Sequence, residues 1–217
     1  MNWSIRNELI SDFRLVEEIT RKAFWNLHKP GCDEHYLVHV MRNHGDFIPE
    51  LDLVLEVDGR VIGNIMYTRS ALIDERGCEK PILTFGPVSI LPEYQRKGYG
   101  KKLIEYSFGI AQSMGHEVIV IFGNPANYVS LGFKSCMKFN ICYGEAFFPT
   151  ALLVKELREG ALKDEQKMYY RESDVFTVNE EDAEKFDRDF EKMEKRVTPS
   201  QEEFFILSNS RLFPLTA

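Results

Sequence analysis

The chain has 217 residues, of which 44% are hydrophobic and 28% charged, so it can build one sizeable core, and the disordered and fibrous classes are excluded. Its formal net charge of -7 argues against a nucleic-acid partner, because affinity for a phosphate backbone depends largely on Lys and Arg. The N-terminus lacks a basic segment followed by an apolar one, and the longest apolar run, 118–122, is far below the roughly 20 residues that cross a bilayer, so we expect a cytoplasmic protein without a membrane partner.

The N-terminal third predicts two helices followed by a hairpin. Apolar residues recur at helical spacing from Ser11, the expected N-cap, to Asn26, and a second helix is expected to begin at Asp33 and end near Gly45. Two apolar runs, 51–57 and 61–73, flank Asp58-Gly59, a pair that accepts the positive φ angles of tight turns. We therefore expect two helices that cover a sheet, and a β-hairpin within that sheet.

The next predicted strand, 81–91, carries Gly86 and Pro87 in its middle. Pro87 cannot donate a hydrogen bond to a neighbouring strand, and Gly86 accepts the backbone geometry of a bulge. This strand is therefore expected to bend and to part from a neighbour, which leaves a gap in the sheet.

A crossover unit follows. Residues 101–114 are periodic like a helix, Gly115 is the expected C′ residue, and 118–122 predicts a short buried strand. The order strand, helix, strand makes the strands 81–91 and 118–122 parallel neighbours. A short helix is expected within 124–132, and closing strands over 133–142 and 151–157.

After Gly160 the composition becomes more charged. A helical pattern runs through this stretch until Pro199 ends it, and Ser200 with Glu203 predicts the capping box of a final short helix. Two arrangements stay open, a helical extension that packs on its own domain and one that forms an oligomer contact such as a homodimer. The apolar positions of the pattern are Ala183, Phe186, Phe190, Met193 and Val197.

The turn Q-R-K-G-Y-G, residues 95–100, joins a predicted strand to a predicted helix, a position where unpaired N–H groups and the helix dipole favour phosphate. A Walker A loop is excluded because Gln95 occupies its first glycine position and Lys102 its final hydroxyl position. A dinucleotide-binding fingerprint fails because Leu103 stands where the third glycine is needed. The turn therefore predicts an anion site of another kind.

A third pattern, Q/R-x-x-G-x-G/A, is satisfied by Gln95, Gly98 and Gly100. It follows V-S-I and L-P-E-Y, and it precedes V-I-V-I-F and N-P-A-N-Y-V-S-L-G-F, which ends at Phe133. In this context the chain resembles the GNAT superfamily of acetyl-CoA-dependent N-acetyltransferases over residues 1–157. The segment G-A-L, with the later Tyr169 and Tyr170, is similar to a bacterial YhbS-like branch.

The resemblance implies an α/β fold with a mixed, splayed central sheet flanked by helices. It implies an acetyltransferase domain over 1–157 and a helical C-terminal extension over 158–217. It also implies acetyl-CoA as cosubstrate without a metal, with the pyrophosphate on the loop and the pantetheine arm along the bent strand. The residues assigned to the cofactor in this way are Val88, Ser89, Ile90, Gln95, Arg96, Lys97, Gly98, Tyr99, Gly100, Lys101 and Asn124. For Asn124 a second role stays open, the start of the short helix.

The implied reaction moves an acetyl group to a primary amine by direct attack in a ternary complex. Tyr128 matches the family's general acid, which protonates the departing thiolate. No carboxylate matches the family's base by motif, so Glu56, Glu93 and Glu145 are open candidates beside a water relay or an amine that arrives neutral. Without an assigned base, a non-catalytic acyl-CoA binding or sensing module stays open as the alternative.

The acceptor has no motif of its own. Its selection is expected to fall to the N-terminal helices and to the loop 143–149, so small amines, antibiotics, peptide N-termini and protein lysines all stay open. His35 and His39 are spaced for one helix face, but a zincin needs Glu after its first His and Tyr36 stands there. The four cysteines form no C-x-x-C pair and are interpreted as small hydrophobic residues in a reducing compartment.

Overall fold

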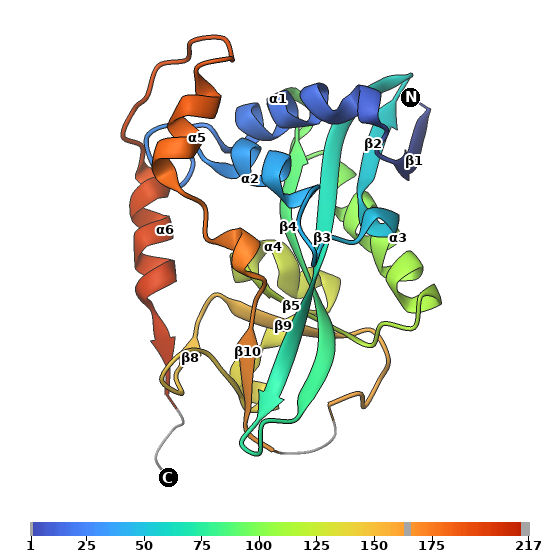
Figure 1. The fold of residues 1–217 in the computed structure, drawn as a ribbon, viewed down its shortest axis with the longest axis vertical. Helices are drawn as coiled ribbons and strands as arrows, with labels where there is room; N and C mark the ends of the chain where they lie inside the picture. Colours follow the sequence, from blue (N-terminus) through green and yellow to red (C-terminus); the bar gives the residue numbers. More distant parts are fainter. Residues whose placement is uncertain (1, 163–165, 214–217) are drawn as a thin grey trace.

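The structure, a computed structural model, describes residues 2–162 and 166–213. Within these residues, nine strands form one large and mostly antiparallel sheet, and helices lie on both of its faces (Figure 1). Along the sheet the order is β1-β2-β3-β4-β5-β9-β6, and β10 pairs with both β3 and β7. This is the mixed α/β architecture that the sequence predicted.

The strands and helices have the following bounds. The sheet contains β1 Trp3–Asn7, β2 Leu53–Val57, β3 Arg60–Asp74, β4 Glu79–Ile90, β5 Val118–Phe122, β6 Lys134–Ser135, β7 Ile141–Cys142, β9 Leu152–Glu156 and β10 Met168–Arg171, and a separate pair is formed by β8 Phe148–Pro149 and β11 Arg211–Leu212. The α-helices are α1 Phe13–Phe24, α2 Glu34–Met41, α3 Tyr99–Ser113, α4 Pro125–Tyr128, α5 Glu180–Asp187 and α6 Pro199–Asn209. The 3₁₀ turns are η1 Ile10–Asp12, η2 Pro49–Leu51, η3 Pro92–Tyr94, η4 Val129–Leu131, η5 Cys136–Phe139 and η6 Asp174–Phe176.

The strand β4 has two different edges. Its antiparallel pairing with β3 is interrupted opposite Gly86 and Pro87, where the register shifts between Ile65 and Tyr67. On its other edge, β4 is paired with the parallel strand β5 at Leu83 and Ile119, and the two strands separate beyond that point. The predicted bend and gap are therefore confirmed.

The helices are fixed to the two faces of the sheet by buried apolar contacts and by hydrogen bonds between hydroxyl groups. Ser89 Oγ donates to Thr20 Oγ1 of α1 at 2.8 Å on one face, and the hydroxyls of Tyr67 and Ser107 of α3 lie 2.7 Å apart on the other. The core has fully buried residues from α1, α2, α3 and β3, and each such side chain contributes about 1.5–3 kcal/mol. Examples are Ile19, Met41, Ile62, Ile65 and Leu103.

The C-terminal segment joins the body of the molecule at several places. β10 adds to the main sheet, which the sequence analysis did not predict, and α5 lies against α2, while α6 runs along one side toward β8 (Figure 1). The Trp25 indole N–H donates to the Glu194 carbonyl, and Thr198 Oγ1 donates to the Asn26 carbonyl. The division of domains at residue 157 stays a prediction.

Two expected helix starts differ from the structure. The N-cap of α1 is Asp12 instead of Ser11, because a 3₁₀ turn precedes the helix and the Asp12 carboxylate accepts the Leu9 N–H at 2.9 Å. The N-cap of α6 is Thr198, and Pro199 opens this helix instead of ending the previous one. Proline fits the first helical turn, since its missing N–H would have no intrahelical partner there.

Two expected elements are shorter or divided. Residues 133–142 form β6 and β7 with the turn η5 between them, because Asn140 takes a positive φ of 52° that ends η5 and turns the chain toward β7. The helical pattern over 183–197 yields only α5, which ends at Asp187. Beyond it, Phe190 packs under the Arg14 guanidinium, 3.5 Å from the ring centroid, as part of an irregular segment.

Within residues 2–162 and 166–213, no helix combines the length and the apolar composition needed to cross a membrane. The cysteines are all free thiols. Three of them are buried like small hydrophobic residues, as expected, whereas Cys78 is exposed in the turn between β3 and β4.

Candidate active site

A cleft of about 670 Å³ opens where β4 and β5 separate. Its walls come from β4, the loop before α3, the end of β5 with α4, and the segment that joins α1 to α2. Nine of the residues that the sequence assigned to the cofactor or to catalysis line it. They are Val88, Ile90, Gln95, Arg96, Gly98, Gly100, Lys101, Asn124 and Tyr128.

Three predicted residues do not line the cleft. Ser89 is buried and its side chain faces α1, because successive residues of a strand point to opposite faces. Lys97 Nζ donates to the Glu93 carbonyl at 2.7 Å, and the Tyr99 ring packs against Tyr94 with ring centroids 6.0 Å apart. The Ser89 side chain therefore contacts α1, and the side chains of Lys97 and Tyr99 contact the turn before the loop, instead of lining the cleft.

The loop before α3 exposes main-chain groups to the cleft. Gln95 Nε2 donates to the Ile90 carbonyl at 2.9 Å and so ties the loop to the end of β4. Arg96 and Gly98 both have positive φ, 57° and 83°, and Gly98 is the N-cap of α3 without a side-chain cap. The first N–H groups of a helix have no acceptor within it, so this end of α3 presents donors and a positive dipole end beside Lys101.

Tyr128 stands on the opposite wall, on the short helix α4. Its ring packs against Phe85 and Phe133, with centroid distances of 5.9 and 5.7 Å. A methyl group at Gly123 would lie 2.5 Å from the Tyr128 ring, so the glycine leaves room for this position of the ring. Burial raises the pKa of Tyr128 to about 12, which keeps the hydroxyl protonated at neutral pH.

Asn124 has a structural role that the sequence analysis left open. Its Oδ1 accepts the Ala126 N–H at 3.0 Å, so it is the N-cap of α4. It also lines the cleft at the end of β5.

The three candidate bases lie elsewhere. Glu56 accepts from Arg6 Nε at 2.9 Å on the β1–β2 side, Glu93 pairs with Arg60 at 3.1 Å, and Glu145 is exposed in the turn between β7 and β8. The carboxylates that line the cleft are instead Glu34 and Glu172. No local sequence signal marks either one, because each reaches the cleft only through the packing of α2 or β10.

The two histidines at helical spacing do not converge on a metal. His35 Nε2 lies 3.1 Å from Asp187 Oδ1 in the interior, whereas His39 Nδ1 lies 2.9 Å from Glu17 Oε1. Among the described residues, one group has candidate ligand atoms within 4.8 Å of one another, namely His44, Asp46 and Asp174. Asp174 is 88% exposed and this group is not part of the cleft lining.

Comparison with known proteins adds to this geometry. The model of the acetyltransferase (GNAT) family matches residues 12–136, which is more than half of the chain and includes the loop, α3 and Tyr128. The chain belongs to the GNAT family. A curated relative, the uncharacterized N-acetyltransferase YjhQ of Escherichia coli, is 29% identical over 127 residues, which are 58% of this chain and 66% of YjhQ.

Two crystal structures of GNAT proteins share the fold. YhbS from Escherichia coli, in complex with CoA, has a TM-score of 0.70 at 21% identity and covers 82% of this chain and 93% of its own. A GNAT acetyltransferase from Brucella melitensis, in complex with acetyl-CoA, has a TM-score of 0.63 at 24% identity and covers 81% of this chain and 98% of its own. Both agree with a GNAT architecture that extends beyond the family match.

Proposed function

We propose that this GNAT protein transfers an acetyl group from acetyl-CoA to a primary amine by direct attack in a ternary complex. The observation that carries the proposal is the separation of β4 from β5 after Leu83 and Ile119, with the glycine-rich loop at one end of the resulting cleft and Tyr128 on its wall. The complexes of the two GNAT neighbours with CoA and acetyl-CoA support this ligand.

The cleft suits the parts of the cosubstrate. The pyrophosphate binds the N–H groups at the start of α3, with Arg96 and Lys101 adding positive charge. The pantetheine arm follows β4 past Ile90 and Val88, where main-chain groups beyond Leu83 face the gap instead of β5. The thioester then reaches the bend at Gly86, near Tyr128.

In the reaction, the amine nitrogen attacks the thioester carbonyl and the C–S bond breaks. A fixed main-chain N–H at the bend of β4 polarises the carbonyl without reorganisation. Tyr128 supplies the proton that the departing thiolate takes up. The alternative is a module that binds or senses acyl-CoA through the same loop but does not catalyse acetyl transfer.

The test measures release of the CoA thiol from acetyl-CoA over a panel of primary amines, together with calorimetry of CoA binding. We expect turnover with at least one amine, and we expect Tyr128→Phe to lower kcat by about tenfold or more while CoA affinity stays unchanged. Tyr106→Phe is the matched control, since Tyr106 is 47% exposed on α3 and does not line the cleft. Binding of CoA without turnover on any amine would favour the sensor instead.

A homodimer and a cytoplasmic location remain part of the proposal. The exposed apolar residues of the C-terminal segment support the dimer, because Phe205 and Ile206 of α6 are 61% and 58% exposed. Sedimentation of the intact chain measures its oligomeric state.

A further inference from the structure

We propose that Glu172 binds the acceptor's protonated amine, and that the acceptor is a cationic primary amine carried on an apolar, aromatic chain. The inference rests on the proposed acetyl transfer and names the substrate class for that same cleft. It depends on four observations: the position of Glu172, its lack of a cationic partner, the aromatic groups beside it, and its place relative to the acetyl group.

Glu172 is held in position by the sheet. It directly follows β10, which pairs with β3 on one edge and with β7 on the other. Ser173, the next residue, is buried and is the N-cap of η6, while Arg171, the previous residue, points elsewhere and pairs with Glu79 at 2.7 Å. Glu172 therefore lines the cleft from a position fixed directly beside a paired strand, although the residue lies outside the family match.

Glu172 differs in its partner from three other carboxylates of the interior, Glu8, Glu17 and Asp187. Glu8 and Glu17 pair with Arg42, and Asp187 pairs with Arg21. Among the described residues, the partner of Glu172 is the neutral hydroxyl of Tyr143, which donates to Oε1 at 2.9 Å. A half-buried carboxylate without a cation is costly, so this position favours a cationic ligand.

The pKa shifts of Glu172 and Tyr143 agree with a cationic ligand at this position. Burial raises the pKa of Glu172 above its usual range, and the hydrogen bond from Tyr143 opposes the rise. Burial and the nearby carboxylate raise the pKa of Tyr143 to about 12, so its hydroxyl keeps the proton that it donates. An ammonium ion would stabilise the charged form of Glu172, and a proton received from that ion would be retained more readily than at an exposed carboxylate.

Aromatic side chains surround this end of the cleft. Phe122 and Phe176 line it, and Phe122 is 42% exposed although it is apolar. Tyr143 and Tyr170 pack behind Phe122, with ring centroids 5.0 and 6.0 Å from its own. Aromatic rings attract both cations and flat apolar groups, so they fit an amine on an aromatic chain better than a small polar amine.

The position along β4 places Glu172 on the acceptor side of the acetyl group. Tyr170, two residues before Glu172, has its hydroxyl 2.6 Å from Thr84 Oγ1. Phe176, four residues after Glu172, has a ring atom 3.8 Å from the place where a Cβ on Gly86 would lie. Because the CoA loop follows the other end of β4, beyond Ile90, the amine and the cosubstrate approach Gly86 from opposite ends of the cleft.

The proton balance is simple. The ammonium gives one proton to the Glu172 carboxylate, and the neutral nitrogen then forms the C–N bond to the thioester carbonyl carbon. The C–S bond breaks with its electron pair on sulfur, sulfur takes the Tyr128 proton, and the second proton of the nitrogen restores the Tyr128 hydroxyl. Glu172 releases its proton to water when the amide leaves, so an ammonium and a thioester yield an amide, a thiol and one proton.

The test compares phenethylamine with its neutral isostere 2-phenylethanol by calorimetry on the full chain saturated with CoA, where no turnover takes place. We expect the wild type to bind the amine about tenfold or more tightly than the alcohol, and Glu172→Gln to lower this ratio to near one with CoA affinity unchanged. Glu75→Gln, an exposed change in the turn between β3 and β4 outside the cleft lining, should keep the ratio. Turnover of phenethylamine should show a higher KM and a lower kcat in Glu172→Gln.

Two results would overturn the inference. One is a wild type that binds the alcohol as tightly as the amine or binds neither, and the other is a Glu172→Gln variant that keeps the wild-type ratio. Either result leaves the proposed acetyl transfer intact if other amines are turned over. Conversely, CoA binding without turnover on any amine would remove the proposed function, and the amine-to-alcohol ratio would still decide the role of Glu172.

Discussion

The Tyr128 ring occupies a narrow space in the wall of the cleft, and the absence of a side chain at Gly123 leaves room for it. The Tyr128 ring is enclosed by Phe85 and Phe133, and on its remaining side it approaches the main chain at Gly123. The Gly123 N–H also donates to the Ala151 carbonyl at 2.9 Å, which fixes that stretch of main chain. An added side chain at residue 123 must therefore displace the ring and not the backbone.

For this reason we expect Gly123→Ala to move the Tyr128 hydroxyl and to lower kcat by about tenfold or more, since proton transfer depends on close geometry. CoA affinity should change little, because the loop before α3 lies on the other wall. Steady-state kinetics and calorimetry check both values.

The control is Gly109→Ala on α3, where an added methyl group meets open space. It should keep kcat and raise the free energy of unfolding by about 0.5–1 kcal/mol, because alanine is the better helix former. An unchanged kcat in Gly123→Ala would contradict the proposed role of the Tyr128 position.

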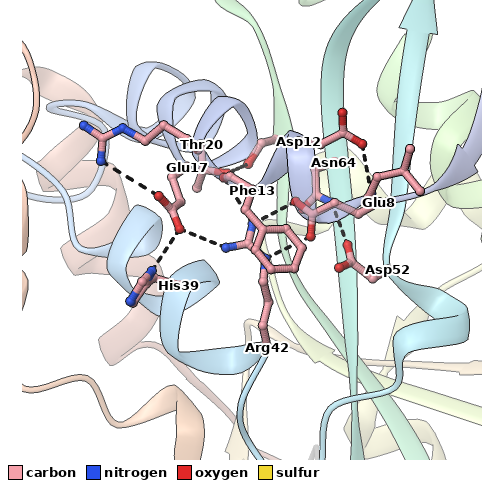
Figure 2. Close-up of polar contacts among 12 residues, drawn as sticks. Glu8, Asp12, Phe13, Glu17, Thr20, His39, Arg42, Asp52 and Asn64 are labelled. Carbon is pink, nitrogen blue, oxygen red and sulfur yellow. Dashed lines mark hydrogen bonds and ion pairs between the residues drawn. The ribbon is translucent and has the colours of Figure 1, made fainter.

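At the scale of elements, a buried polar network connects β1, α1, α2 and β2. Figure 2 shows Arg42, at the end of α2, between Glu17 of α1 and Glu8, which follows β1. Arg42 Nη2 donates to Glu8 at 2.7 Å, and Asn64 Nδ2 donates to Asp52 at 2.9 Å. The network fixes the two helices that border the cleft, and its charges are compensated except where Glu8 and Asp52 meet.

The proximity of the Glu8 and Asp52 carboxyl groups predicts that the free energy of unfolding depends on pH. Burial and the neighbouring Glu8 carboxylate raise the pKa of Asp52 to about 9, so folding retains a proton that the unfolded chain loses near its ordinary value of 3.8. A raised pKa contributes stability that is fully present below the unfolded value and is lost as the pH rises through the folded value.

We therefore expect Asp52→Asn to gain stability relative to the wild type as the pH rises from about 4 to 9. The asparagine side chain can accept a hydrogen bond from Asn64 and donate one to Glu8, and unlike the Asp52 carboxylate it needs no added proton to do so. Urea denaturation at several pH values measures the difference, with Glu50→Gln, an exposed neighbour, as control. A difference that stays constant with pH would contradict the shared proton.

At the scale of the whole molecule, the C-terminal segment completes the cleft and is held to α1 and α2 by a second buried group. Asp187 Oδ1, on α5, accepts a hydrogen bond from Arg21 Nε at 2.6 Å and lies 3.1 Å from His35 Nε2. The rings of Phe186 and Phe190 pack on His35 with centroid distances of 5.5 and 5.1 Å. The position of α5, and with it the chain that follows Glu172, depends on these contacts.

Protonation of His35 opposes this arrangement. Burial lowers the pKa of His35 to about 4, with Arg21 acting in the same direction and Asp187 against it. Between about pH 6.5 and 4 the unfolded chain binds the proton and the folded chain does not, so stability falls as the pH falls through this range.

We expect His35→Gln to remove that part of the acid sensitivity, which appears as a smaller loss of unfolding free energy between pH 7 and 5 than in the wild type. His39→Gln is the matched control, because His39 lies one turn away on α2 and its side chain is 48% exposed. An equal slope in wild type and His35→Gln would exclude His35 as the source.

The sequence by itself determined the parts whose geometry is local. The turn at Asp58-Gly59, the bend at Gly86-Pro87 and the loop before α3 each follow from backbone preferences of a few adjacent residues, and the residue pattern around Tyr128 identified the family. The tertiary structure alone decided which carboxylates face the cleft, because Glu172 and Glu34 reach it through strand pairing and helix packing that no local pattern encodes. For the same reason, the helical pattern over 183–197 ends as a helix at Asp187. Phe190 is buried by contacts with α1 and α2, and such contacts between distant segments override periodicity.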